Sequence, residues 1–241
     1  MRGFVDLHCH FLAGIDDGAP SEDEGLAMLG SLHTLGFSKV VATPHMRPGM
    51  FDNEKAALVS AFERIEPLVR SRPNLPEVAL SSEHYFADVV YERLLAGAAL
   101  PYPGGRAVLL EFWGNDFPEI VMHRLFDLRQ RGLMTVIAHP ERYRCLWRSR
   151  EILERLVDSG AAALLDTAAL VGKYGREPKR CALDLLEQGL YHAACSDAHR
   201  ASDVAEVEKG MRFIAETYGE DEVEYLFGAG PSAILAGERA E

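Results

Sequence analysis

The segment FVDLHCHFLAGIDDG (residues 4–18) places a short apolar run directly before two histidines and, a turn later, two adjacent aspartates. The run from Phe4 to Leu7 has the character of a buried strand, and residues two apart in a strand point to the same side. His8 and His10 are therefore expected to converge on one point. Alone, an HxH pair is equally compatible with two structural histidines. Its interpretation depends on whether other strands also end in possible metal ligands.

Strand-like runs and amphipathic helical patterns alternate along the whole chain. The stretch SEDEGLAMLGSLHTLG (residues 21–36) predicts a helix that starts with a capping box of Ser21 and Glu24 and ends at Gly36. PEIVMHRLFDLRQRG (residues 118–132) repeats this scheme. The expected strands are residues 4–8, 39–43, 78–82, 107–112, 134–138, 162–166 and 191–195.

The alternation predicts right-handed βαβ units and a parallel sheet, and so many units favour a closed or nearly closed barrel over an open sheet. No GxGxxG follows the first strand and no GxxxxGK[ST] occurs, which removes the commonest reasons for an open nucleotide-binding sheet. No repeat or linker divides the chain, so we expect one domain over residues 1–241.

Composition restricts the class of protein. The 241 residues are 48% hydrophobic and 26% charged, as in ordinary globular proteins. The net charge of −12 argues against a non-specific nucleic-acid or anionic-membrane binder. No stretch resembles a transmembrane helix or a signal peptide, and the four cysteines lack CxxC or disulfide-framework spacing. A cytoplasmic location without direct membrane insertion is therefore expected.

Imidazole and carboxylate groups recur at the ends of six expected strands. His45 follows KVVAT, Glu83 follows VALSS, Glu111 lies in AVLLEF, HPER (139–142) follows TVIA, and SDAH (196–199) follows HAAC. In parallel α/β folds the carboxyl ends of the strands face one shared crevice. Each motif alone is more often a loop histidine or a capped turn, but chance does not readily supply the recurrence. Imidazole with carboxylate suits divalent Zn, Mn or Fe, so a multinuclear metal site is predicted.

These motifs, in this order, resemble the PHP (polymerase and histidinol phosphatase) superfamily of metal-dependent phosphoesterases. The nearer resemblance is to the CpsB-type bacterial protein-tyrosine phosphatases, which share GIDDG, TPHxRxGMF and HPERY with this chain over essentially its full length. The resemblance implies an α/β fold, a distorted (β/α)7 barrel of the PHP type. It also implies three divalent metal ions, with Mn²⁺ as the first expectation and Fe, Zn or Co as alternatives.

Carried over residue by residue, the resemblance implies three metal positions. Asp17 is informative because many other PHP branches have a histidine there, whereas the tyrosine-phosphatase branch has the aspartate of DDG. The implied ligand sets are His8, His10, Glu83 and Asp197 for the first ion, a bridging Glu83 with Glu111 and His139 for the second, and Asp17, His45 and His199 for the third.

The implied chemistry is hydrolysis of a phosphomonoester. Three divalent ions and four carboxylates leave a charge of about +2, which suits a phosphate dianion, and metal-activated water is the expected nucleophile. Arg142 of HPER and Arg47 of HMRPGMF are the expected planar donors to phosphate. Relatives place a further arginine beyond SDAH, where this chain has ASDVAEVE, and Arg200 directly follows His199 instead. His84 occupies a position that is often hydrophobic in the family.

The resemblance therefore implies a metal-dependent protein-tyrosine phosphatase. Its implied partner is a phosphotyrosyl protein, a membrane-associated bacterial tyrosine kinase of capsule or exopolysaccharide synthesis. A small-molecule phosphatase, such as one for histidinol phosphate, stays open as the alternative. A metal-dependent amidohydrolase is less favoured, because none of the five lysines ends a middle strand beside the site. A cysteine-based mechanism is set aside, because no cysteine is followed by arginine at i+6.

Other chemically notable residues have structural interpretations. Cys9 and Cys195 are expected to be small buried residues turned away from the site. Asp166 ends a strand and is equally compatible with a partner for a ligand histidine or a helix cap. The remaining histidines outside the predicted ligand sets and position 84 are interpreted as structural: His33, His123 and His192.

Overall fold

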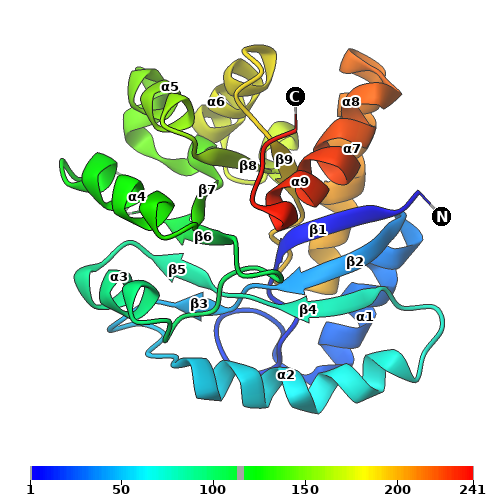
Figure 1. Ribbon diagram of the computed structural model, residues 1–241. Coiled ribbons are helices and arrows are strands. Elements are labelled where there is room, and N and C mark those ends of the chain that lie inside the picture. The colour runs from blue at the N-terminus through cyan, green and yellow to red at the C-terminus, as the bar shows by residue number, and fades with distance from the viewer. Residues whose placement is uncertain (1, 113–116, 241) are drawn as a thin grey trace.

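The computed structural model describes residues 2–112 and 117–240. Figure 1 shows strands in the centre of the molecule and helices around their outside. The strands are β1 (Phe4–Cys9), β2 (Phe37–Ala42), β3 (His45–Met46), β4 (Glu77–Leu80), β5 (Glu83–Tyr85), β6 (Ala107–Glu111), β7 (Met134–Ala138), β8 (Ala162–Asp166) and β9 (Ala193–Cys195). The helices are α1 (Glu22–Thr34), α2 (Lys55–Arg70), α3 (Asp88–Leu95), α4 (Val121–Gln130), α5 (Glu151–Asp158), α6 (Arg176–Glu187), α7 (Val204–Tyr218), α8 (Glu220–Glu224) and α9 (Gly230–Ala236).

The named strands pair in parallel throughout, in two sheets. Their orders are β1-β2-β4 and β3-β5-β6-β7-β8-β9. The sheets join where the segment after β9 returns to β1: Asp197 donates its N–H to the His8 carbonyl at 2.9 Å, and His10 donates to the Ala198 carbonyl at 2.9 Å. The prediction of a distorted (β/α)7 barrel is confirmed.

Two of the expected strands end one or two residues earlier than predicted, and each is followed by a second short strand that was not predicted. Residues 39–43 and 78–82 were expected as single strands, but β2 stops before Thr43-Pro44 and β4 stops before Ser81-Ser82. Pro44 has no N–H to donate to a strand ladder, which favours a break there. After the breaks the chain continues as β3 and β5, in which His45 stands opposite Glu83. The break thus places two predicted ligands side by side.

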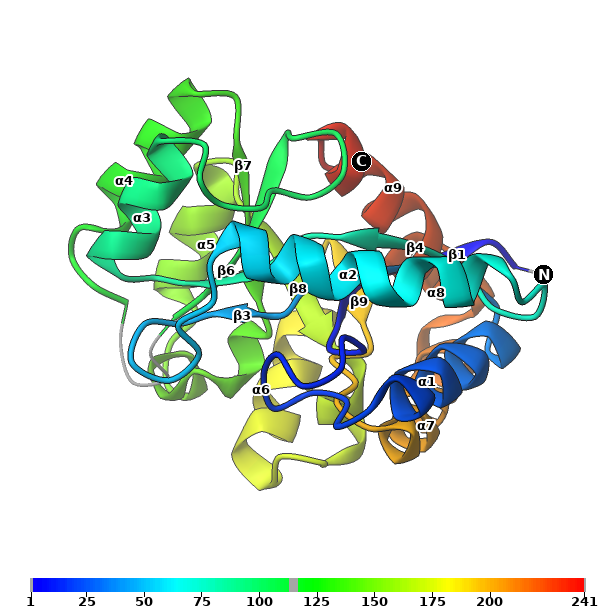
Figure 2. The same ribbon diagram turned by 90° about the horizontal axis from the view of Figure 1, so that it is seen from below.

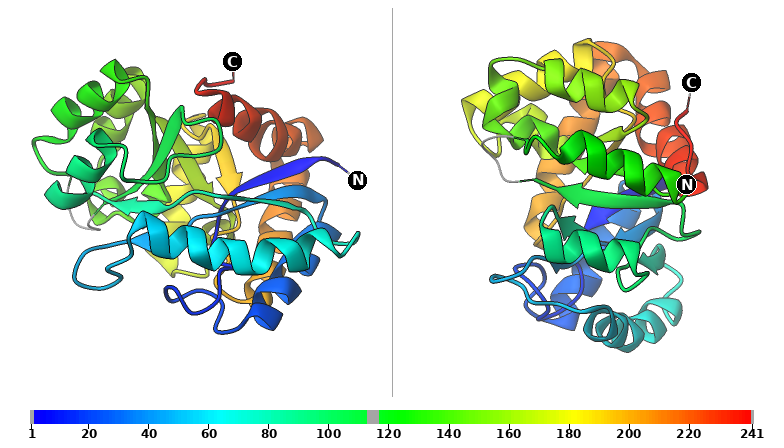
Figure 3. Two further views of the ribbon diagram at one scale, coloured as in Figure 1. Left: turned by 60° about the horizontal axis from the view of Figure 1, so that its bottom comes forward. Right: turned by 60° about the vertical axis from the view of Figure 1, so that its left-hand side comes forward.

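Apolar residues on the strands alternate between an inner and an outer cluster. Leu109 and Leu164 belong to the cluster inside the barrel, whereas their neighbours Leu110 and Leu165 pack in the cluster that includes the helices. Both faces of the strands are therefore buried, as expected of parallel strands covered by helices. Helix α2, for example, contacts β4 along the outside of the barrel (Figure 2, Figure 3).

Helix α1 starts as predicted at its N-cap, but only half of the predicted capping box forms. The Ser21 hydroxyl accepts the Glu24 N–H at 3.3 Å. The Glu24 carboxylate accepts the N–H of Ala201 at 2.9 Å instead of returning to Ser21. A tertiary contact has therefore replaced the local one. Within the described residues, none of the helices is both long and apolar enough to cross a membrane.

Candidate metal centre

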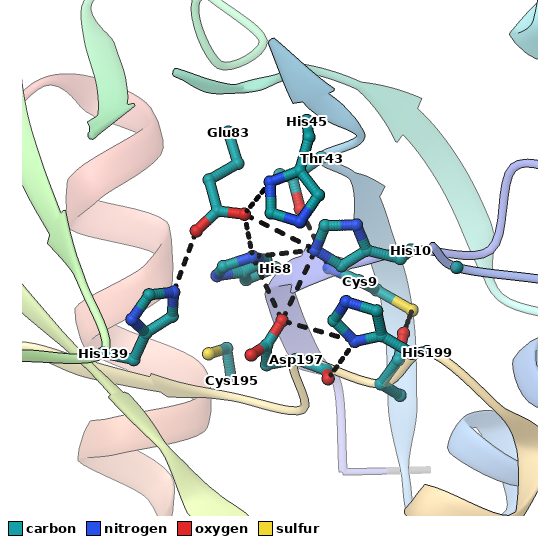
Figure 4. Close-up of polar contacts among 12 residues, drawn as sticks. His8, Cys9, His10, Thr43, His45, Glu83, His139, Cys195, Asp197 and His199 are labelled. Carbon is teal, nitrogen blue, oxygen red and sulfur yellow. Dashed lines mark hydrogen bonds and ion pairs between the residues drawn. The ribbon is translucent and has the colours of Figure 1, made fainter. Parts of the chain in front are cut away.

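The nine predicted metal ligands lie together at the carboxyl ends of the strands. Figure 4 shows all of them except Asp17 and Glu111. Their imidazole nitrogens and carboxylate oxygens form four overlapping groups, in each of which the ligand atoms lie within 4.8 Å of one another. The groups are His8, His10 and Asp197; His8, Glu83 and His139; His45, Glu83 and Glu111; and His10, Asp17, His45 and His199.

Four side chains converge at the position expected for the first ion. His8 Nε2 lies 3.1 Å from His10 Nε2. Asp197 Oδ1 lies 3.2 Å and 3.4 Å from these two nitrogens. Glu83 Oε2 lies 3.4 Å from His8 Nε2 and 3.7 Å from His10 Nε2. The register of β1 shifts between Asp6 and Cys9, and such a bulge redirects the side chains that follow it.

Both oxygens of Glu83 are engaged, each toward a different histidine. Oε1 lies 2.8 Å from His139 Nε2, and Oε2 lies 2.8 Å from His45 Nδ1. This arrangement suits a bridging carboxylate. The grouping around it differs in one respect from the predicted second set: Glu111 falls with His45 and Glu83, whereas His139 falls with His8 and Glu83.

The third predicted set is also brought together, with one additional member. Asp17 Oδ1 lies 3.4 Å from His45 Nε2 and 3.5 Å from His199 Nε2. His10 joins this group, and its ring stacks on His199 with centroids 4.1 Å apart. His10 therefore stands between the first and third positions.

Two of the nine residues have left-handed backbone conformations. His139 has φ 31° and Asp197 has φ 42°, and they are the two non-glycine residues with positive φ in the described part of the chain. This conformation is costly for a residue with a Cβ and persists where the surroundings impose it, commonly at functional sites. Each residue follows shortly after a strand, at the point where the chain turns across the carboxyl end of the barrel.

The loop after β1 fits closely over its own strand. A Cβ at Gly18 would stand 2.2 Å from the His10 carbonyl oxygen, so a side chain is excluded there. The Arg200 guanidinium donates to the Asp17 carbonyl at 2.8 Å and also to the Gly18 carbonyl. Arg200 therefore ties the DDG loop to the SDAH loop through backbone carbonyl groups.

Burial and charge displace the pKa values of the ligand residues. Burial, assisted by the Arg142 charge, lowers the pKa of His139 to about 4, which keeps its imidazole neutral. Burial also opposes charge on His45, but the neighbouring Glu83 and Asp17 carboxylates raise its pKa to about 11. Burial and the Glu83 charge raise the pKa of Glu111 to about 7. The Glu83 and Glu111 carboxylates thus repel each other, and the positive charges of His45 and Arg47 partly offset this repulsion.

The donor set fits divalent cations. Asp197 Oδ1 is buried without a hydrogen-bond partner, and the Nε2 atoms of His8 and His10 face it. Buried polar atoms in folded proteins are nearly always satisfied, so an unpaired carboxylate oxygen that faces two imidazole nitrogens calls for a cation. Neutral imidazole and carboxylate at such spacing is the donor chemistry of Zn²⁺, Mn²⁺ and Fe²⁺.

An open hollow of about 280 Å³ lies over this cluster. Both predicted phosphate-binding arginines line it. Arg142 Nη1 lies 2.9 Å from Asp197 Oδ2, and its guanidinium stands 4.9 Å from the centre of the Tyr174 ring. Arg47 Nη1 lies 3.5 Å from Glu111 Oε2, and its guanidinium stands 4.5 Å from the Tyr85 ring centre. Both cations therefore stand beside predicted ligands.

Three side chains near the site had no assigned role in the sequence reasoning. Asp16 accepts from His10 Nδ1 at 2.8 Å, and its place beside Asp17 was the available signal. Tyr85 stacks on Arg47 and Tyr174 stacks on Arg142. No local sequence pattern predicts these contacts, because the partners are far apart in the sequence.

The contacts of His84 and Asp166 show their structural roles. Both ring nitrogens of His84 pair with backbone groups, the Leu109 carbonyl at 2.9 Å and the Leu100 N–H at 3.3 Å, so it does not line the hollow. Asp166 accepts the Ala168 N–H at 3.0 Å, which is the helix-capping alternative.

The two cysteines beside ligands behave differently. Cys9 turns outward against Met28, as expected. The expectation that Cys195 turns away was wrong, because it lies two residues before Asp197 and alternation places it on the same side, inside the barrel. Its thiol contacts the Leu165 carbonyl at 3.2 Å, and burial raises its pKa well above the usual range.

The remaining histidines are structural, as predicted. His33 is partly exposed on α1, and His123 is exposed and lies beside Asp127. His192 is buried, and its Nδ1 accepts the Ala163 N–H at 3.2 Å.

Comparison with known proteins gives concordant matches. The sequence model for the family described as capsular polysaccharide synthesis, CpsB/CapC, matches residues 4–236. The tyrosine-protein phosphatase YwqE of Bacillus subtilis (strain 168) is 31% identical over 195 residues, 81% of this chain and 77% of that protein. The tyrosine-protein phosphatase CpsB of Streptococcus pneumoniae is 25% identical over 96% of this chain and 98% of that protein.

A solved structure agrees with the fold over nearly the whole chain. It comes from crystal structures of YwqE from Bacillus subtilis and CpsB from Streptococcus pneumoniae, described as unique metal-dependent tyrosine phosphatases. The superposition has a TM-score of 0.88 at 27% identity and covers 98% of this chain and 96% of that one.

Proposed function

This chain belongs to the CpsB/CapC family of capsular polysaccharide synthesis, and from that premise we propose that it is a metal-dependent protein-tyrosine phosphatase. The observation that carries the proposal is the overlap of two features at one end of the barrel. Nine imidazole and carboxylate ligands converge there, and two arginines line the hollow above them. A phosphomonoester dianion needs both features, a multivalent cationic centre and planar donors around it.

The proposed centre holds three divalent ions, with Mn²⁺ as the first candidate and Fe, Zn or Co as alternatives. Its ligands are the nine residues that the sequence predicted. When bound, such ions supply positive charge for the phosphoryl oxygens and lower the pKa of water so that hydroxide becomes available near neutral pH. The overlapping groups around Glu83 and His10 support ions placed close together.

The arginines hold phosphate in fixed directions. Burial opposes charge on Arg142, but Asp197 and Asp166 hold its pKa above its usual range, so the guanidinium stays protonated. The Tyr174 ring limits its rotation from one side. A guanidinium fixed in this way presents its remaining N–H groups to phosphoryl oxygens as a planar fork. Arg47, stacked on Tyr85, offers a second donor from β3's side of the hollow.

The mouth of the hollow is suited to an aromatic leaving group. Met50 lines it with a side chain that is 61% exposed, and Phe51 stacks on His45 with ring centroids 5.2 Å apart. Phe112 and Tyr143 line the hollow deeper in, where both are buried. An exposed thioether and aromatic rings make favourable contacts with a phenyl ring. This apolar mouth above a cationic floor favours an aryl phosphate such as phosphotyrosine.

The proposed substrate is a phosphotyrosyl protein, and the proposed partner is a membrane-associated bacterial tyrosine kinase of capsule or exopolysaccharide synthesis. We place the enzyme in the cytoplasm, with residues 1–241 as one catalytic domain. The direct test is a parallel assay of the Mn²⁺-loaded protein on a phosphotyrosyl peptide and on histidinol phosphate. We expect the peptide to have the higher kcat/KM. A higher value for histidinol phosphate would favour the small-molecule alternative, and no turnover of either would refute the proposal.

A further inference from the structure

Asp16 makes three hydrogen bonds from a fully enclosed position. Its side chain is 1% exposed. Oδ2 lies 2.8 Å from His10 Nδ1 and also accepts the backbone N–H of His45 at 3.0 Å. Oδ1 accepts the N–H of Gly18 at 2.9 Å. One carboxylate therefore contacts the side chain of one proposed ligand, the backbone of a second, and the loop that carries a third, Asp17.

The contact with His10 determines which ring nitrogen carries the proton. A carboxylate can only accept, so Nδ1 must be the donor, and the other nitrogen is left with its lone pair exposed. That other atom, Nε2, faces His8 Nε2 at 3.1 Å and Asp197 Oδ1 at 3.4 Å. The imidazole is thus oriented with its lone pair toward the proposed ions. Partners of this kind fix the tautomer of ligand histidines and raise their basicity.

We propose that Asp16 is a positioning residue that fixes the tautomer and ring direction of His10 and, through the His45 backbone, joins the first and third metal positions. This inference rests on the proposed metal centre. It assigns the two aspartates of DDG to different tasks. Asp17 turns its carboxylate toward His45 and His199 as a ligand, whereas Asp16 points back beneath His10.

The variants Asp16→Ala and Asp16→Asn separate this role from a purely structural one. Alanine removes all three bonds and leaves His10 free to place its proton on Nε2, where it blocks a metal ion. Asparagine can turn its amide oxygen toward His10 and His45 and loses only the contact with Gly18. The affinity for Co²⁺, measured by titration with the visible absorption of bound Co²⁺ as the signal, should therefore fall about 10- to 100-fold in Asp16→Ala. Asp16→Asn should recover most of the loss.

Asp52→Ala is the matched control. Asp52 accepts the Gly49 N–H at 2.7 Å in an exposed loop, which is the same kind of bond as that between Asp16 and Gly18. We expect Asp52→Ala to bind Co²⁺ like the wild type. Thermal unfolding of each metal-free variant reports whether the fold survives, and Asp16→Asn answers the question if Asp16→Ala does not fold.

A double-mutant cycle tests whether Asp16 acts through His10. In a His10→Ala background, Asp16→Ala should cost little further Co²⁺ affinity, because the ring that it orients is gone. Full additivity of the two losses would overturn the inference, as would unchanged Co²⁺ binding in Asp16→Ala. A wild-type protein that binds no Co²⁺ at all would refute the proposed metal centre on which the inference rests.

Discussion

Arg142→Ala is the most informative single change at the proposed phosphate site. The Arg142 guanidinium contacts Asp197 at 2.9 Å and faces the hollow with its side chain one-quarter exposed. Its direction is fixed by this contact and by the Tyr174 ring. Removal of one preorganised donor of this kind costs about 2–4 kcal/mol in transition-state stabilisation. This loss corresponds to a decrease in kcat/KM of roughly 30- to 1,000-fold.

The assay compares kcat/KM on a phosphotyrosyl peptide among the wild type and three variants, all loaded with Mn²⁺. Arg142→Lys should recover only part of the activity, because an ammonium group cannot reproduce a planar fork. Arg144→Ala, two residues further on and exposed, is the matched control and should resemble the wild type. Metal content should be unchanged in each, which separates phosphate binding from assembly of the centre. Full activity of Arg142→Ala at normal metal content would refute the reasoning.

Three further predictions follow from the same geometry. Replacement of all four cysteines should spare turnover apart from packing losses, because both thiols nearest the site are buried with raised pKa values; a trapped phosphocysteine would contradict this. Met50→Ala should raise KM for the phosphotyrosyl peptide several-fold while the inhibition constant for inorganic phosphate stays the same. An equal change in both constants would show that Met50 does not contact the aryl group. Burial lowers the pKa of His192 to about 4 from 6.5, so its contribution to the free energy of unfolding is complete above pH 6.5 and decreases as the pH falls toward 4. Urea unfolding of His192→Gln should show a smaller loss than the wild type over that range, and identical profiles would contradict the assignment.

The barrel could be predicted from sequence because its signals are local and repeated. Each strand is a short apolar run, and each helix has its own start and stop residues, so alternation alone defines the βαβ units. The breaks at Thr43-Pro44 and Ser81-Ser82 were not predicted. β2 and β4 are short apolar runs, whereas β3 and β5 are only two and three residues long and mostly polar, so no apolar run marks them in the sequence.

The sequence predicted which residues come together at the site, but not fully which of them group around the same ion. The nine candidate ligands could be named because each lies at the end of an expected strand or in the segment after it, and the strands of a parallel barrel share one end. Which ligands share an ion depends on side-chain direction, and this explains why Glu111 groups with His45 instead of His139. The supporting contacts of Asp16 and Tyr174 depend on loop conformation, for which the sequence carries no periodic signal.

The central claim is that the nine ligands form a trinuclear metal centre, and elemental analysis of the purified protein tests it most directly. We expect about three divalent ions per chain in the wild type, with losses in His10→Ala and Asp197→Ala but none in His33→Ala. A protein without bound transition metal, whose phosphatase activity is unaffected by a chelator, would contradict the account.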